Sequence, residues 1–250
     1  MRFFSSEIGQ RYDSYTFGYA NYCECEAEDA LHQLYALGYL PYSGSPNAHN
    51  VFYMARSARV DLARFELSSE NRRIAKKFDG EFTKERIAFK DFAVTHEFID
   101  FCLSYFAQKH GASAMPKARL EHILASGLMT HIIVYTKESK PVAYVFAVAD
   151  EHCEHYWFSF YDLSLARQSL GLWLMLDCLR DAKARASMHY YLGTVYGETA
   201  LYKTNFEPLE WYDGKSWSSD IKLLKERGRS DDTRTLPATD AWKEDLQSFN

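Results

Sequence analysis

The stretch THIIVYTKESKPVAYVFAVADEHCEHYWFSFY, residues 130–161, contains three apolar runs that are typical of β-strands. The runs cover residues 130–136, 142–149 and 155–161, and β-branched and aromatic residues are frequent in each of them. The polar segment KESK between the first two runs has the composition of a hairpin turn. These residues therefore predict the centre of a sheet, with an antiparallel hairpin followed by a third strand.

Helical patterns surround this sheet in the sequence. Apolar side chains recur at helical spacing in residues 91–110, and a second helix is predicted from Pro116 to the residue before Gly127. A helix over 169–184 and a strand over 190–193 follow the sheet residues. This order resembles that of an acyl-CoA-dependent N-acetyltransferase (GNAT) domain. We therefore expect an α/β fold (α+β, with a mixed sheet) that contains a GNAT-like acyltransferase domain.

The N-terminal part predicts a smaller α+β region packed on that domain. Its pattern indicates a short helix over 26–38, strands over 51–54 and 60–65, and a helix from Ser68 or Ser69 to Lys77. We expect residues 1–80 to form this region, 81–217 the GNAT-like domain, and 218–250 a loosely attached polar tail with one helical turn anchored by Trp242.

The composition, 47% hydrophobic and 25% charged, is that of a globular protein. No apolar run approaches the roughly 20 residues of a membrane helix, and no signal-peptide stretch opens the chain, so we expect a cytoplasmic protein. Five scattered cysteines argue against a disulfide framework. The pair Cys23 and Cys25 is too closely spaced for zinc and has no second pair nearby, so no metal site is expected.

Charge is unevenly distributed along the chain. The net charge of −5 argues against a general nucleic-acid coat protein, but residues 56–90 carry ten basic residues against six acidic ones. Such a basic face is compatible with the docking of a tRNA end, and a solvated helix face is the alternative. The candidate tRNA-binding residues in this segment are Arg56, Arg59, Arg72, Arg73, Lys76 and Lys77.

Residues 168–173, Gln-Ser-Leu-Gly-Leu-Trp, lie at the turn into the helix over 169–184. The acetyltransferase pattern there is Gln/Arg-x-x-Gly-x-Gly/Ala, whose backbone N–H groups hold the pyrophosphate of coenzyme A. Gly171 matches this pattern, but Trp173 replaces its last small residue. We expect the indole to obstruct coenzyme A and to leave the position to an anionic donor of another shape. The alternative is an ordinary helix start.

The stretch HYYLGTVYGETALYKTNFEPLEWYDGKSW, residues 189–217, resembles the C-terminal region of arginyl-tRNA–protein transferases and of their bacterial relatives, the aspartate/glutamate leucyltransferases. The matching elements are Tyr191-Leu192-Gly193, Tyr202-Lys203, Phe206, Pro208 and Glu210. Upstream, Phe160-Tyr161-Asp162 and Ser169-Leu170-Gly171 look like the same family's Tyr-Asp segment and Ser-Leu-Gly turn. With weaker matches nearer the N-terminus, the resemblance spans roughly residues 15–217. The family's second cysteine cluster is replaced by Met54–Arg59, so the metal site of some relatives is not expected here.

The resemblance implies an aminoacyltransferase of the N-degron pathway. It would move Arg or Leu from a charged tRNA to the N-terminal amine of an acceptor protein whose first residue is acidic. The aminoacyl ester is already activated, so the enzyme needs to align the reactants, keep the amine neutral and stabilise the oxyanion. The aminoacyl-tRNA is a co-substrate and no cofactor is implied. Two alternatives stay open: a GNAT N-acyltransferase that uses acyl-CoA, and a non-catalytic relative that binds tRNA or protein N-termini.

The same resemblance suggests roles for individual residues. Asp162 is expected to orient the incoming amine or to cap a turn, and Tyr202 and Lys203 are expected in the active centre. Lys203 would contact the terminal phosphate or the acidic acceptor, with a surface lysine as the alternative. Further substrate or tRNA contacts are expected at Tyr161, Ser169, Gly171, Tyr191 and Gly193, and core packing is the alternative for Tyr161 and Tyr191. The apolar patterns around His96 and His155 predict core histidines at both positions.

Overall fold

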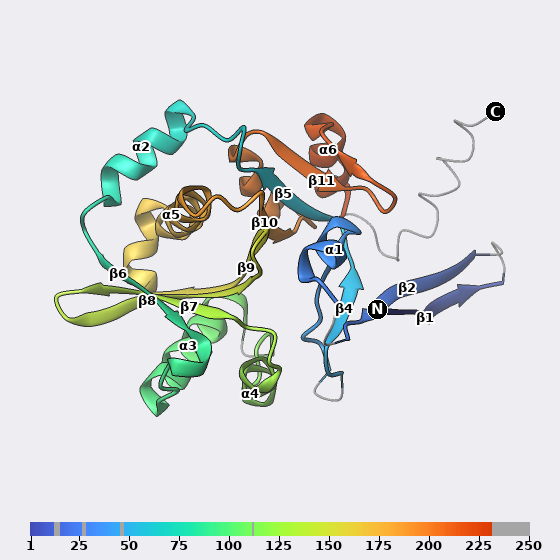
Figure 1. The fold of residues 1–250 in the computed structure, drawn as a ribbon, viewed down its shortest axis with the longest axis horizontal. Coiled ribbons are helices and arrows are strands. Elements are labelled where there is room, and N and C mark those ends of the chain that lie inside the picture. Colours follow the sequence, from blue (N-terminus) through green and yellow to red (C-terminus); the bar gives the residue numbers. More distant parts are fainter. Residues whose placement is uncertain (13–15, 27–28, 46–47, 112, 232–250) are drawn as a thin grey trace.

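An eight-stranded mixed sheet forms the centre of the molecule (Figure 1). The structure, a computed structural model, describes residues 1–12, 16–26, 29–45, 48–111 and 113–231. The sheet has the order β12-β11-β5-β10-β9-β8-β7-β6. Its strands are β5 (Ser57–Asp61), β6 (Thr83–Ala88), β7 (His131–Lys137), β8 (Lys140–Ala149), β9 (Cys153–Tyr161), β10 (His189–Thr194), β11 (Leu209–Tyr212) and β12 (Trp217–Ser218).

The predicted hairpin is confirmed as β7 and β8, and β9 pairs antiparallel with β8. Glu138 and Ser139 both have positive φ, which matches the right-handed twist of a short hairpin. Along β8, Val145 faces one hydrophobic cluster, whereas Tyr144 and Phe146 face the cluster on the opposite side. Both faces of the sheet are therefore buried, which explains the nearly continuous apolar run in the sequence.

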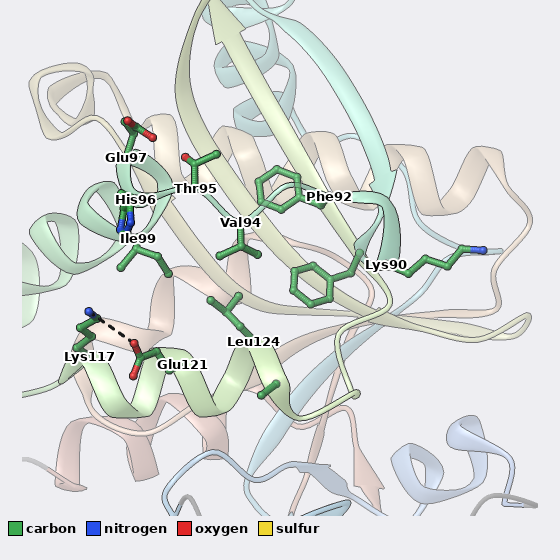
Figure 2. A pocket seen from close by; sticks show the side chains of 12 residues that line it. Lys90, Phe92, Val94, Thr95, His96, Glu97, Ile99, Lys117, Glu121 and Leu124 are labelled. Atoms are coloured by element: carbon green, nitrogen blue, oxygen red, sulfur yellow. Dashed lines mark ion pairs between the residues drawn. The ribbon is translucent and has the colours of Figure 1, made fainter.

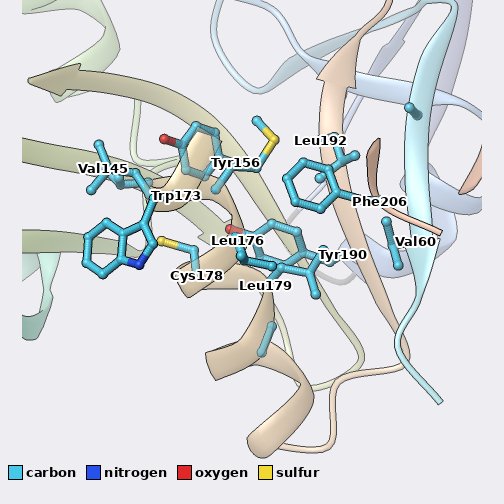
Figure 3. Close-up of a cluster of buried hydrophobic side chains, with 14 of the residues drawn as sticks. Val60, Val145, Tyr156, Trp173, Leu176, Cys178, Leu179, Tyr190, Leu192 and Phe206 are labelled. Carbon is cyan, nitrogen blue, oxygen red and sulfur yellow. The ribbon is translucent and has the colours of Figure 1, made fainter. Parts of the chain in front are cut away.

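One face of the sheet is covered by α5 (Leu170–Ala184), and α2 (Ser69–Phe78) packs against α5 (Figure 1). Figure 3 shows buried side chains of this layer, among them Trp173, Leu176 and Leu179 of α5. Trp173 lies at the centre of this layer. Its ring centroid is 5.6 Å from that of Phe78 and 5.5 Å from that of Tyr135, and its indole N–H donates to the Asp79 carboxylate at 3.0 Å. Ser68 caps α2 with a reciprocal bond to Asn71, as predicted for one of the two serines.

The opposite face packs against α3 (His96–His110) and α4 (Lys117–Ala125). The prediction placed the start of α3 at residue 91. The chain instead forms a short 3-10 turn, η1 (Phe89–Asp91), and α3 begins after Thr95, whose hydroxyl accepts from the Phe98 N–H. An N-cap side chain thus decides the helix start where apolar periodicity does not.

A four-stranded antiparallel sheet of order β1-β2-β4-β3 forms the N-terminal part. It packs with α1 through Tyr35 and Phe52 onto Val148 and Tyr191 of the large sheet. The helix predicted over 26–38 is shorter than expected, and the β1–β2 ribbon was not predicted. The elements are β1 (Arg2–Arg11), β2 (Thr16–Glu24), α1 (Leu31–Ala36), β3 (Tyr39–Pro41) and β4 (Val51–Met54).

The expectation of a loose tail from residue 218 is wrong for its first part. Residues Ile221–Asp231 form α6, which buries Leu224 and packs on the 3-10 segment η3 (Glu198–Asn205). Trp242 lies in 232–250, outside the described residues. The domain division at residue 80 stays a prediction, although β5 from the N-terminal side lies between β10 and β11 in the large sheet.

Across the described residues, no helix combines the length and apolar character required to cross a membrane.

Replacing Trp173 by Ala is expected to lower the free energy of unfolding by about 3–5 kcal/mol, because it leaves a cavity between α2, α5 and the sheet. Leu223→Ala on α6 is the matched control: this side chain is 36% exposed, and a change within about 0.5 kcal/mol is expected. Urea unfolding followed by circular dichroism measures both. Equal losses in the two variants would contradict the central role of Trp173.

Candidate functional site

The large sheet opens between its two parallel strands. β9 and β10 pair only from His189↔Cys153 to Tyr191↔His155, and both strands then continue without pairing to each other. Gly193 has a φ of +82°, and the register between β10 and β5 shifts between Tyr191 and Gly193. A cleft of about 870 Å³ lies where the two strands part.

Five elements line this cleft: the end of α3, β9, the start of α5, the end of β10, and η3. Of the predicted site residues, the structure places Tyr161, Ser169, Gly171, Gly193, Tyr202 and Lys203 in it. The sequence patterns did not point to the contribution of α3, which is Tyr105, Phe106, Lys109 and His110. Lys109 and His110 lie in the last helical turn before Gly111. The sequence predicts this helix end, but it does not predict that the helix end lies near β10.

The charged lining of the cleft has one sign. Lys109, His110 and Lys203 are its basic residues, and no Asp or Glu occurs among the described residues that line it. Aromatic side chains make up much of the remaining wall: Tyr105, Phe106, Tyr156, Trp157, Phe158, Tyr161 and Tyr202. Aromatic faces beside cations are suited to an anionic ligand with flat rings, such as a nucleotide.

Lys203 provides the cation at the point where the strands part. Its Nζ donates to the Thr194 carbonyl at 2.7 Å and lies 5.9 Å from the Tyr202 ring centroid. Within the described part of the chain, no carboxylate pairs with this ammonium group. Desolvation in the cleft lowers its pKa to about 8.

His155, on β9, lies next to Lys203. It is buried, as predicted for a core histidine. Its Nδ1 is 2.9 Å from the hydroxyl of Tyr35, which belongs to α1. Desolvation, aided by the charge of Lys203, lowers the pKa of His155 to about 3, so the imidazole is neutral at physiological pH.

The turn into α5 differs from the expectation in one respect. The Trp173 indole does not obstruct this turn, because it points into the core and contacts Phe78 of α2. The group over the turn is instead the Tyr161 hydroxyl, which lies 2.7 Å from the position that a Cβ would take at Gly171. Ser169, just before the helix, has a φ of +71° and leaves the first turn without a side-chain cap.

Asp162 and Tyr191 do not line the cleft. The Asp162 carboxylate accepts the Ser164 N–H at 2.8 Å, which is the turn-capping role left open by the sequence. Tyr191 is buried on the other side of the sheet, where its ring packs against Tyr35 and Trp217.

Arg56 and Arg59, which lie just before β5 and on it, are tied into the structure. Arg56 forms an ion pair with Asp231 of α6 and lies over the Tyr196 ring. Arg59 pairs with Glu210 at 2.8 Å and lies 4.1 Å from the Trp217 ring centroid. Both guanidinium groups therefore have protein partners. Arg56 links the chain after β10 to α6, and Arg59 helps to hold β5, β11 and β12 together.

The basic face predicted on α2 is present, and its four side chains, Arg72, Arg73, Lys76 and Lys77, are exposed. Arg73 forms an exposed ion pair with Glu70, three residues earlier on the helix. None of the four lines the cleft. A role of α2 in tRNA binding therefore stays a prediction and would concern RNA outside the cleft.

A second cavity, of about 780 Å³, lies between the start of α3 and α4 (Figure 2). Its wall is largely apolar, with Val94, Ile99 and Leu124, and Lys117 and Glu121 form an ion pair at its edge. His96 lies here, exposed, so its prediction as a core histidine is wrong. None of the predicted catalytic or binding residues reaches this cavity.

Metal-binding side chains are not clustered in the ranges described above. No three His, Cys, Asp or Glu residues of those ranges gather closely enough to hold a metal ion. Cys23 is buried and Cys25 half-buried, and neither forms a disulfide.

Comparison with known proteins identifies a family. The model of the Acetyltransferase (GNAT) domain matches residues 64–204, more than half of the chain. The match includes β6 to β10, α3, α4, α5 and the part of η3 that carries Lys203.

Relatives that share sequence with the chain carry the name aspartate/glutamate leucyltransferase. One from Nitrosococcus oceani is 29% identical over 178 residues, which cover 68% of this chain and 71% of the relative. One from Rhizobium meliloti is 39% identical over 85 residues, but these cover 33% of this chain and only 30% of the relative's length. Among solved structures, FemX is similar with a TM-score of 0.43 and 8% identity, over 68% of this chain and 61% of that one.

Gly193→Ala is expected to lower the free energy of unfolding by about 1–2 kcal/mol, because an L-residue is strained at a φ of +82°. Gly9→Ala is the control, since the Gly9 backbone is not in that region and its added Cβ meets no atom within 4 Å. Thermal unfolding measures both variants. A Gly193→Ala protein as stable as the wild type would contradict the conformation that opens the cleft.

Proposed function

Because the chain belongs to the family of GNAT acetyltransferase domains, we propose that the cleft between β9 and β10 is the active centre of an aminoacyltransferase. The enzyme would move an amino acid from a charged tRNA to the N-terminal amine of an acceptor protein. The relatives named aspartate/glutamate leucyltransferase support this reaction. A reaction that draws on charged tRNA suits the cytoplasm.

One observation carries the proposal: the cleft combines an aromatic wall with cations and has no carboxylate among its described lining residues. The 3′ end of a tRNA offers a base for stacking, a ribose ester and a phosphate. Tyr161 and Tyr202 offer aromatic rings, while Lys109 and the protonated form of Lys203 offer positive charge. The uncapped start of α5 supports binding of a phosphate at Ser169 and Gly171.

The same lining favours leucine over arginine as the transferred amino acid. A guanidinium group taken out of water requires a carboxylate partner, and the cleft offers none among its described residues. The apolar side chains of Leu172, Met175 and Leu192 suit a branched aliphatic group. The basic groups in turn favour an acceptor whose first side chain is acidic, and such acceptors are the substrates of the N-degron pathway.

The acyl-CoA alternative retains one supporting observation. Trp173 does not obstruct the start of α5, so a pyrophosphate that passes the Tyr161 hydroxyl over Gly171 has access to backbone N–H groups there. The aromatic wall and the sequence relatives favour the RNA donor, and the two donors are separated by a direct assay.

We expect transfer of radiolabelled leucine from Leu-tRNA to a peptide that begins with Asp or Glu. Arg-tRNA should give at least tenfold less product, because the cleft lacks a partner for the guanidinium group. A peptide that begins with Lys is the acceptor control, and acetyl-CoA is the donor control. Acetyl transfer without any transfer from charged tRNA would refute the proposal.

Lys109→Glu is expected to weaken Leu-tRNA binding about tenfold, which corresponds to the loss of one charged hydrogen bond. Arg73→Glu should have a smaller effect, because Glu70 already neutralises Arg73 and α2 lies outside the cleft. Filter binding at two salt concentrations measures both affinities, and the salt dependence should weaken more in the Lys109 variant. A larger loss of Leu-tRNA affinity in Arg73→Glu than in Lys109→Glu would indicate that the main RNA contact lies on α2.

A further inference from the structure

We propose that Lys203 is the proton acceptor for the attacking amine and that His155, held by Tyr35, is the positioning residue that leaves Lys203 free for this role. The inference rests on the proposed function, since it concerns the chemical step of that transfer. It assigns distinct tasks to three residues that come from three different elements, η3, β9 and α1.

Gly193 brings these groups together. A Cβ at this position would lie 3.4 Å from His155 Nε2 and 3.5 Å from Lys203 Nζ. The imidazole and the amine therefore flank the same point, on the side of β10 from which a side chain is missing. Only glycine combines this backbone conformation with an open approach to both nitrogen atoms.

Among the described residues, the groups placed near the Lys203 amine are uncharged. They are the Thr194 carbonyl on β10, the His155 imidazole on β9 and the Tyr202 ring on η3. A carboxylate in any of these positions would hold the lysine as a permanent ammonium ion. Without such a partner, desolvation lowers its pKa to about 8, close to the ordinary value of about 8 for an α-amine.

The chemistry balances without any further reactant. The neutral α-amine of the acceptor attacks the ester carbonyl and forms an N–C bond, and the ammonium nitrogen so produced gives one proton to the neutral Lys203 amine. The C–O bond to the tRNA ribose then breaks, its electron pair stays on the ribose oxygen, and Lys203 returns the proton to that oxygen. Proton transfer between groups of similar pKa proceeds with little thermodynamic cost in either direction.

His155 acts through Lys203. Burial keeps the imidazole neutral, and the bond between Nδ1 and the Tyr35 hydroxyl fixes the ring so that Nε2 is presented toward Lys203. A neutral ring excludes water from one side of the amine without pairing with it. A purely structural histidine would have no influence on the protonation of Lys203.

The first test compares Lys203→Arg with the wild type. Arginine keeps the positive charge but cannot give up its proton, so transfer should fall at least about 100-fold while Leu-tRNA binding is retained. Lys222→Arg, an exposed substitution on α6, is the matched control and should transfer normally. If Lys203→Arg retained transfer activity, a permanent cation at position 203 would suffice for the reaction, and the inference would be overturned. A wild type that transfers from no charged tRNA would instead refute the proposed function.

The second test does not require tRNA. Lysines labelled with ¹³C-methyl groups are titrated by NMR in the free protein, and one signal, absent in Lys203→Arg, should titrate near pH 8. His155→Asp should raise the pKa of this lysine and move the rising limb of the pH–rate profile to higher pH, whereas the neutral His155→Gln should leave both in place. Titration of Lys203 near pH 10 in the wild type would overturn the inference even if the His155 variants fail to fold.

Discussion

The separation of β9 and β10 is the constraint on which the rest of the site depends. Parallel strands normally stay paired along their length, but here pairing ends at Tyr191↔His155. Gly193 then turns with a positive φ, and a Cβ at its place would be in contact with His155 and Lys203. Once the strands part, the ends of α3 and α5 and the segment η3 all border the same space. The cleft is therefore a consequence of one backbone conformation and needs no separate domain to form it.

Charged side chains that form ion pairs stabilise the fold, whereas Lys203 in the cleft forms no ion pair with the described residues. Glu154 is 2% exposed and bonds to both Arg86 and Arg185, and Lys84 contacts Asp177 and Asp181 at 2.8 Å. Such charges are compensated and fix the sheet to its neighbours. Among the described residues, Lys203 is held by a backbone carbonyl and an aromatic ring. Desolvation without a counter-ion lowers its pKa, and groups with perturbed pKa values cluster at functional sites.

Much of the fold follows from the sequence, because local rules act there. The apolar runs in 130–161 and the helix over 170–184 were predicted nearly to their ends, since both are buried and long. The β1–β2 ribbon escaped prediction because its strands alternate irregularly and expose Phe3, Phe4 and Tyr19. The site was predicted only in part. Tyr202 and Lys203 were found through the family resemblance, whereas Lys109 reaches the cleft through the packing of α3 on β9, which no local pattern encodes.

At the start of α5, the sequence motif was recognised correctly, but the position of the Trp173 side chain was predicted wrongly. The sequence places Trp173 where coenzyme A-binding relatives have a small residue, which suggested an obstructed turn. In the folded chain, residue 173 lies one turn inside the helix and faces the core, so its size bears on stability and not on access. Access is governed by Gly171, whose missing side chain leaves room for the Tyr161 hydroxyl. A phosphate that approaches the backbone here must meet this phenol, and the hydroxyl is able to donate a hydrogen bond to it. Access to the motif therefore depends on a tyrosine from the end of β9, whose hydroxyl lies against Gly171.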